Sequence, residues 1–215
     1  KQVCPELSII NIGGGLPVPN SLYFDYDYDY MLSEIVLQVK KVCKEEQVPV
    51  PDIYSEFGKY TVAESGSMAF SVLQQKQQND RERWYMIDGS LMTTLPDSWG
   101  IGERFILLPL NKWENEYHRV NIGGLSCDQY DYYNSEVHVA ELYMPKLDDK
   151  APLYIGFFNV GAYQESLSGY GGTKHCLLPS PQFLLLDRDE QGALTSSVFA
   201  PRQSVDRMLD VLGYE

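Results

Sequence analysis

Cysteine is scarce in this sequence, and its four residues stand far apart. Cys4, Cys43, Cys127 and Cys176 form no Cys-x-x-Cys pair, so the spacing indicates neither a disulfide framework nor a zinc ribbon. Histidine is rarer still, with three residues that show no metal-ligand spacing. We therefore expect reduced thiols, as in the cytoplasm, and no metal site.

Long hydrophobic runs and excess positive charge are also missing. The longest apolar stretches, such as residues 105–110, are far too short to cross a bilayer, and Lys1 is not followed by a signal-peptide core. Lys and Arg number 17 against 30 Asp and Glu, which gives a net charge of −13. This surface would repel nucleic acids and anionic membranes, so we expect neither as a partner and predict a soluble, cytoplasmic protein.

The first third of the chain shows the sequence pattern of a β-α-β unit. An apolar run over residues 7–12 predicts a strand, and apolar residues at helical spacing from Met31 to Cys43 predict a helix. Residues 52–55 follow two prolines and predict a second strand.

From about Met68 onward the pattern changes to short runs rich in aromatic and β-branched residues, which are typical of antiparallel strands. The predicted strands cover residues 84–87, 105–108, 117–122, 137–143, 153–160, 183–186 and 197–199. Residues 187–192 predict a hairpin turn, and apolar residues at helical spacing from Val205 to Leu212 predict a closing amphipathic helix.

Three consecutive glycines, Gly13, Gly14 and Gly15, end the first predicted strand. Glycine lets backbone N–H groups converge on a ligand too closely for side chains, and such amide groups bind phosphate. Taken alone, the run also fits an ordinary turn after a strand.

Further motifs follow the glycines in a fixed order. They are Ser-Glu-Phe-Gly-Lys at residues 55–59, Asp-Gly-Ser at 88–90, Leu-Pro-Asp-Ser-Trp-Gly-Ile at 95–101, Cys-Asp-Gln-Tyr-Asp at 127–131 and Gly-Ala-Tyr-Gln-Glu at 161–165. The series resembles the carboxy-terminal part of the fold-type III pyridoxal-phosphate decarboxylases, the ornithine, diaminopimelate and arginine group. Within that group, residues 95–101, 108–110 and 156–165 most resemble the biosynthetic arginine decarboxylases.

The resemblance implies an α+β chain in which the end of an alanine-racemase-like (β/α) barrel precedes a mainly antiparallel, Greek-key-type β-domain. We predict that residues 1–68 form the partial barrel with the cofactor phosphate loop, and that residues 69–215 form the β-domain with its closing helix. The implied reaction is the decarboxylation of arginine to agmatine, a step of polyamine biosynthesis.

The implied cofactor is pyridoxal 5′-phosphate. Gly13, Gly14 and Gly15 would hold its phosphate through backbone amides, with Lys59 adding a cation and Tyr163 a hydroxyl donor. Glu56 matches the family's carboxylate beside the pyridine nitrogen, which keeps that nitrogen protonated and the ring able to accept electrons.

The resemblance also supplies the substrate side of the site. It implies that Cys127 returns a proton to the substrate's α-carbon, and that Asp97 and Asp128 face the distal cation of arginine. In the family the Cys-Asp loop enters the neighbouring subunit's site. We therefore expect a homodimer or larger assembly in which two chains complete each site.

The sequence departs from the family in two respects. Lys59 stands where the family has arginine, which keeps the charge and loses the forked geometry. The family's Schiff-base lysine and ring-stacking histidine precede the glycine motif, where this sequence has only residues 1–12. We thus expect part of an enzyme, inactive by itself. Two alternatives remain: a sister decarboxylase for ornithine or a carboxylated polyamine, or a non-catalytic subunit paired with a true decarboxylase.

Overall fold

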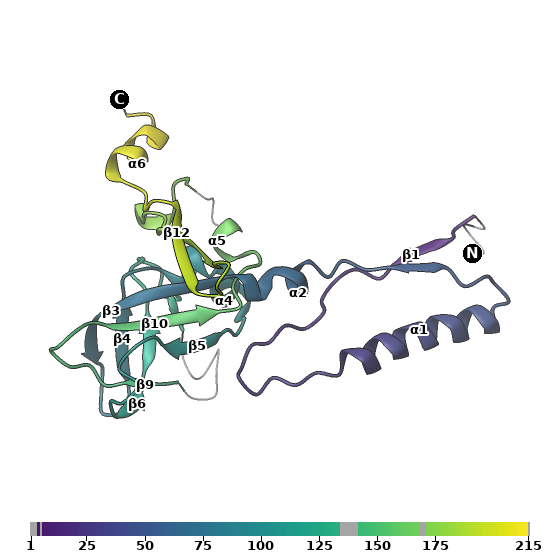
Figure 1. The fold of residues 1–215 in the computed structure, drawn as a ribbon, viewed down its shortest axis with the longest axis horizontal. Coiled ribbons are helices and arrows are strands. Elements are labelled where there is room, and N and C mark those ends of the chain that lie inside the picture. Colours follow the sequence, from purple (N-terminus) through teal and green to yellow (C-terminus); the bar gives the residue numbers. More distant parts are fainter. Residues whose placement is uncertain (1–3, 5, 134–141, 168–170, 215) are drawn as a thin grey trace.

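The computed structural model describes residues 4, 6–133, 142–167 and 171–214. Figure 1 shows a long arm that extends from a β-rich body. The arm contains, in order, β1 (Ile9–Asn11), α1 (Tyr28–Glu45) and β2 (Asp52–Tyr54). β1 and β2 pair in parallel, with Ile10 opposite Ile53. The predicted strand-helix-strand order is therefore confirmed.

Helix α1 begins at a side-chain cap and leaves most of its apolar surface uncovered. The Asp27 carboxylate accepts a hydrogen bond from the Tyr30 amide at 2.8 Å, which satisfies one of the free N–H groups of the first turn. Cys43 is the one buried residue of the helix, whereas Leu37 and Val42 are more than half exposed. The described residues thus provide no cover for this face.

The domain limits at residues 68 and 69 stay a prediction.

A short helix, α2 (Gly58–Val62), and a 3-10 turn, η1 (Ala63–Ser65), join the arm to a six-stranded sheet. The strands of the sheet, in spatial order, are β5 (Ile106–Pro109), β10 (Leu153–Phe158), β3 (Ser67–Gln77), β4 (Arg83–Ile87), β7 (Asn121–Gly123) and β8 (Tyr132–Tyr133). Neighbouring strands are antiparallel except β4 and β7, which pair in parallel. The expected mainly antiparallel α+β fold is confirmed.

The core of the β-domain lies on one face of this sheet. The Phe157 ring on β10 meets Phe70 and Tyr133 edge to face, with ring centroids 5.9 and 5.2 Å apart. Two short helices, α3 (Leu91–Thr94) and α4 (Pro96–Ile101), follow; Leu91 at the start of α3 and Leu95 between the two helices are fully buried. Burying one such side chain stabilises the fold by about 1.5–3 kcal/mol. The core therefore fixes the loops that carry the motifs after residue 88.

The remaining elements form two small sheets and three peripheral helices. They are β6 (Tyr117–Arg119), β9 (Tyr143–Pro145), α5 (Gln164–Leu167), η2 (His175–Leu177), β11 (Phe183–Arg188), β12 (Leu194–Ala200) and α6 (Val205–Leu212). β11 and β12 pair antiparallel, and the Asp189 carboxylate accepts from the Gln191 and Ala193 amides in their turn. Gly192 supplies the positive φ of 81°. The predicted hairpin and closing helix are both confirmed.

The single strand predicted over residues 117–122 is wrong. The chain breaks at the fully buried Val120, whose amide donates to the Leu142 carbonyl at 3.0 Å, and β6 and β7 lie in different sheets. Alternation alone does not reveal such a break because the buried residue keeps the apolar pattern. Of the strand predicted over residues 137–143, residues 137–141 lie outside the described part, and Tyr143 begins β9.

No helix among the described residues is both long enough and apolar enough to cross a membrane. α1, the longest helix, carries charged residues at both ends and along its length.

His118 on β6 is held as a neutral ring between two polar side chains. Arg83 Nη1 lies 2.6 Å from His118 Nδ1, and the Tyr85 hydroxyl, which donates to the Pro145 carbonyl, lies beside His118 Nε2. Burial, and then the Arg83 and Lys146 charges, lower the His118 pKa from 6.5 to about 4. The fold thus favours the uncharged imidazole.

This depressed pKa predicts an acid-sensitive fold. His118 binds a proton more readily in the unfolded chain, so its contribution to stability is complete above pH 6.5 and is lost as the pH falls toward 4. His118→Gln should therefore flatten the fall in the free energy of unfolding over that range, measured by urea denaturation. The matched variant His175→Gln, which replaces an exposed histidine, should keep the full slope. Equal slopes in the two variants would contradict this assignment.

Candidate functional site

The glycine run turns sharply between β1 and the rest of the arm. Gly13 and Gly15 have φ values of 73° and 93°, which favour glycine, and a Cβ on Gly14 would lie 2.5 Å from the Glu56 carbonyl oxygen. The Glu56 amide donates to the Gly13 carbonyl at 2.9 Å. The three glycines thus allow the segments after β1 and β2 to run in contact.

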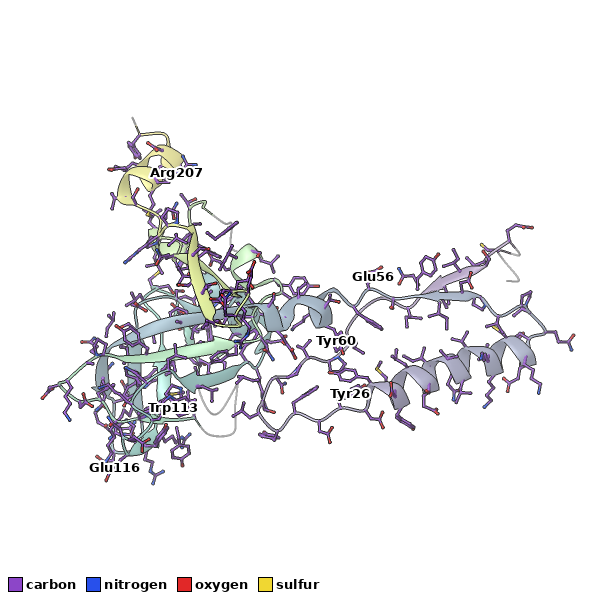
Figure 2. The ribbon with its side chains drawn as sticks, viewed as in Figure 1. Tyr26, Glu56, Tyr60, Trp113, Glu116 and Arg207 are labelled. Carbon is purple, nitrogen blue, oxygen red and sulfur yellow. The ribbon has the colours of Figure 1, made fainter. Side chains whose placement is uncertain are left out.

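A cavity of about 510 Å³ opens beside this contact. It is lined by Gly14, Gly15, Leu16, Pro17, Val18, Asn20, Phe24, Glu56, Phe57, Lys59, Tyr60, Glu103 and Tyr163. The structure therefore brings five of the predicted cofactor residues together: Gly14, Gly15, Glu56, Lys59 and Tyr163. Gly13 does not line the cavity, and its amide donates to Asn11 Oδ1 at 2.8 Å. In Figure 2 the labelled Glu56 and Tyr60 lie where the arm meets the body.

Asn11, which sequence reasoning missed, orients two of these groups. Its Nδ2 donates to Glu56 Oε1 at 2.6 Å, and its Oδ1 accepts from the Gly13 amide. One amide side chain thus ties the Glu56 carboxylate to the glycine turn. The sequence offered a weak signal for this role, since Asn11 is the last residue of β1.

Lys59 forms an ion pair with Glu103, another residue that the sequence did not single out. Both side chains are about three-quarters buried, at 24% and 22% exposure. Lys59 belongs to α2 and Glu103 follows α4, so the pair joins the arm to the β-domain. The Lys59 charge is therefore shared with a carboxylate inside the cavity.

Tyr163 reaches the cavity because two more glycines, Gly66 and Gly161, let two backbone segments touch. A Cβ on Gly161 would lie 2.1 Å from the Val62 carbonyl oxygen, and the Gly161 amide donates to the Ala63 carbonyl at 2.9 Å. Two residues later Tyr163 adopts a positive φ of 67° just before α5. This close approach brings Tyr163 to the cavity that Lys59 and Tyr60 of α2 also line.

The predicted substrate residues lie elsewhere. Gln164 Nε2 donates to Asp97 Oδ2 at 2.8 Å, which links α5 to α4. Asp128 Oδ1 accepts from the Tyr130 amide at 2.7 Å and from Trp99 Nε1 at 3.2 Å. Neither aspartate lines the cavity, nor does Cys127. Within one chain, the structure thus separates the predicted cofactor groups from the predicted substrate groups.

Cys127 is exposed and has unexpected neighbours. Its sulfur lies 3.3 Å from His175 Nε2, and its amide donates to Cys176 Sγ at 3.3 Å. The hydrogen bond and charge of Cys176 raise the Cys127 pKa above its ordinary value. Sequence reasoning assigned no role to His175 or Cys176, and their separation from Cys127 in the chain gave no signal.

The loop that carries Cys127 is fixed by the buried Asp131 carboxylate. Asp131 Oδ1 accepts from the Leu91 and Met92 amides at 2.7 and 3.2 Å, and Oδ2 accepts from the Ser126 amide at 3.0 Å. One side chain therefore ties the start of α3 to the residue before Cys127. Asp131 stood in the Cys-Asp-Gln-Tyr-Asp motif, but its role there was missed.

Several solved structures with the same fold are decarboxylases. The biosynthetic arginine decarboxylase of Campylobacter jejuni superposes with a TM-score of 0.79 at 21% identity, over 100% of this chain and 49% of that one. A diaminopimelate decarboxylase from M. jannaschi gives 0.72 at 19% identity, over 97% and 44%. The chain therefore has the alanine-racemase-like fold of these decarboxylases and spans about half the length of each solved structure.

Several curated proteins that are similar in sequence are biosynthetic arginine decarboxylases. The enzyme of Aeromonas salmonicida is 34% identical over 125 residues, 56% of this chain and 19% of that protein. The enzyme of Proteus mirabilis is 30% identical over 148 residues, 66% of this chain and 22% of that protein. The aligned part is about a fifth of the length of these relatives, and no family model matches the chain.

The geometry around Asp131 predicts a measurable role in stability. Asp131→Ala leaves three amides without their acceptor. The bond to the Leu91 amide is buried and the other two are partly buried, so the substitution should lower the free energy of unfolding by about 3 kcal/mol. Asp131→Asn keeps one acceptor oxygen and should lose less. Urea denaturation measures both. Asp149→Ala, at an exposed aspartate, is the matched control and should change stability little. An Asp131→Ala protein as stable as this control would contradict the assignment.

Proposed function

We propose that this chain supplies the cofactor-binding end and the β-domain of a pyridoxal-phosphate-dependent arginine decarboxylase, which converts arginine to agmatine for polyamine synthesis in the cytoplasm. One observation carries the proposal. Three separate segments of the chain line the same cavity: the glycine turn, the segment that carries Glu56 and Lys59, and the segment that carries Tyr163.

The cavity has the chemistry that a phosphate ester needs. Gly14 and Gly15 offer backbone amides, Lys59 a cation and Tyr163 a hydroxyl, which together suit a dianion. The space where a Gly15 side chain would stand is open, with no atom within 4 Å of the added Cβ. These residues fit the phosphate of pyridoxal phosphate. Lys59 would then form ion pairs with both that phosphate and Glu103.

Glu56 is suited to the opposite end of the cofactor. When bound, pyridoxal phosphate supplies an electron sink for the pair of electrons left by departing carbon dioxide. The Glu56 carboxylate would hold the pyridine nitrogen protonated, and the 2.6 Å hydrogen bond from Asn11 would orient that carboxylate. Asn11 is therefore a positioning residue in this proposal.

The substrate groups would come from a second chain. Cys127 would return a proton to the α-carbon of the substrate, while Asp97 and Asp128 would accept hydrogen bonds from its guanidinium. None of the three lines the cavity of its own chain. This separation supports a homodimer, or a larger assembly, in which the Cys127 loop of one subunit completes the cavity of another.

Arginine is favoured over ornithine because the curated relatives are named arginine decarboxylases.

One observation favours a second candidate, a non-catalytic subunit that pairs with a true decarboxylase. Lys59 replaces a forked arginine and is already paired with Glu103. A weak phosphate site would result if that pair did not open.

Glu56→Gln tests the catalytic proposal in the whole enzyme that contains this chain. The amide cannot hold the pyridine nitrogen protonated, and a loss of ~4 kcal/mol of transition-state stabilisation would lower kcat about a thousandfold. The cofactor's visible absorbance should be largely kept, because the phosphate contacts remain. Carbon dioxide release from arginine measures the rate.

Glu114→Gln serves as the matched control, since Glu114 is exposed and does not line the cavity. It should decarboxylate arginine at the rate of the unaltered enzyme. If Glu56→Gln kept that rate as well, Glu56 would have no place in the site. If the unaltered whole enzyme bound no cofactor, the non-catalytic alternative would replace the proposal.

Subunit mixing tests the shared site. Cys127→Ala and Glu56→Gln enzymes should each be nearly inactive, yet a randomly mixed dimer population should regain roughly a quarter of the activity, because half of the dimers are hybrids and each hybrid has one intact site. Mixing two batches of Cys127→Ala gives the baseline. Baseline activity in proven hybrids would mean that Cys127 acts in its own chain's site or in none.

A further inference from the structure

Three metal-ligating side chains meet on the exposed surface beside the Cys127 loop. The ligand atoms of Cys127, His175 and Cys176 all lie within 4.8 Å of one another. The Cys127 sulfur is 3.3 Å from His175 Nε2, and the Cys176 sulfur accepts from the Cys127 amide. The cofactor cavity contains none of these residues.

These separations suit a tetrahedral zinc ion. Zinc binds thiolate sulfur at about 2.3 Å and imidazole nitrogen at about 2.0–2.1 Å, so two such ligands at a tetrahedral angle lie about 3.5 Å apart. The observed sulfur-to-nitrogen distance of 3.3 Å is close to that value. Two thiolates and an imidazole are also the soft and borderline donors that select zinc over magnesium or calcium.

Buried charged side chains hold both of the loops that supply the ligands. On one side the buried Asp131 carboxylate holds the Ser126 amide. On the other, Lys174 pairs with Glu165 at 2.8 Å, with side-chain exposures of 1% and 7%. The ligands therefore project from positions fixed by buried charges, which lowers the cost of arranging them around an ion.

We propose that Cys127, Cys176 and His175 form a binding site for a zinc-class divalent cation. Binding would release the two thiol protons to solvent and leave a fourth position open to water or another small ligand. The sequence predicts no metal site here because Cys127 and His175 are 48 residues apart. The three ligands come together only when η2, which carries His175 and Cys176, folds against the loop that carries Cys127.

One consequence rests on the proposed function. Cys127 bound to a metal ion cannot return a proton to the substrate, so zinc would inhibit the decarboxylase reversibly. The metal site itself does not depend on that function, and its test therefore measures binding instead of turnover.

Cobalt titration tests the site directly. The reduced 215-residue chain, freed of metal by a chelator, should take up one equivalent of Co²⁺ under anaerobic conditions and show a thiolate-to-cobalt absorption band that Zn²⁺ abolishes. Cys127→Ser, Cys176→Ser and His175→Ala should each weaken Co²⁺ binding at least ~10-fold. All three positions are exposed, and circular dichroism should confirm that the variants stay folded.

Cys4→Ser is the matched control, because Cys4 is an exposed thiol outside the cluster. It should bind Co²⁺ as the unaltered chain does. The proposal would be overturned if the band were lost in Cys4→Ser and kept in Cys176→Ser. It would equally be overturned if the reduced chain gave no band and the two sulfurs only formed a disulfide on exposure to peroxide.

Discussion

A side chain at position 14 would collide with the Glu56 carbonyl oxygen, so the segments after β1 and β2 touch only because that residue is glycine. Much of the candidate site depends on this contact. It sets Glu56 beside Asn11 and leads the chain into α2, where Lys59 reaches Glu103. The site is thus built by backbone proximity first, and charged side chains occupy the space that results.

The cofactor residues that the sequence singled out are those marked by a local pattern. Glycine runs mark close backbone approach, and the fixed order of Glu56, Lys59 and Tyr163 carried the resemblance to a decarboxylase. It missed Asn11, Glu103, Asp131 and His175, because each acts through a partner that only tertiary folding brings near. The strand prediction over residues 117–122 failed for a related reason: burial at Val120 preserves the alternation while the chain changes sheet.

Buried charge anchors the two loops that meet at Cys127. Asp131 accepts three amides, and the Lys174–Glu165 pair lies almost wholly out of solvent. A charge so placed strongly disfavours any arrangement that removes its partner, so each loop has one preferred position. The exposed cluster of Cys127, His175 and Cys176 is therefore positioned by buried polar groups, whereas the contact within the arm is made possible by glycine.

The strand order of the main sheet has a consequence for how the protein is made. β10 lies between β5 and β3, although it follows β3 by some eighty residues in the chain. On the ribosome, β3 and β4 emerge before β10, and one edge of β3 has no partner until β10 has been synthesised. An unpaired strand edge invites pairing with other chains. Nascent copies of this protein are therefore open to aggregation during that interval, and a holding chaperone that shields the β3 edge would raise the yield of folded protein.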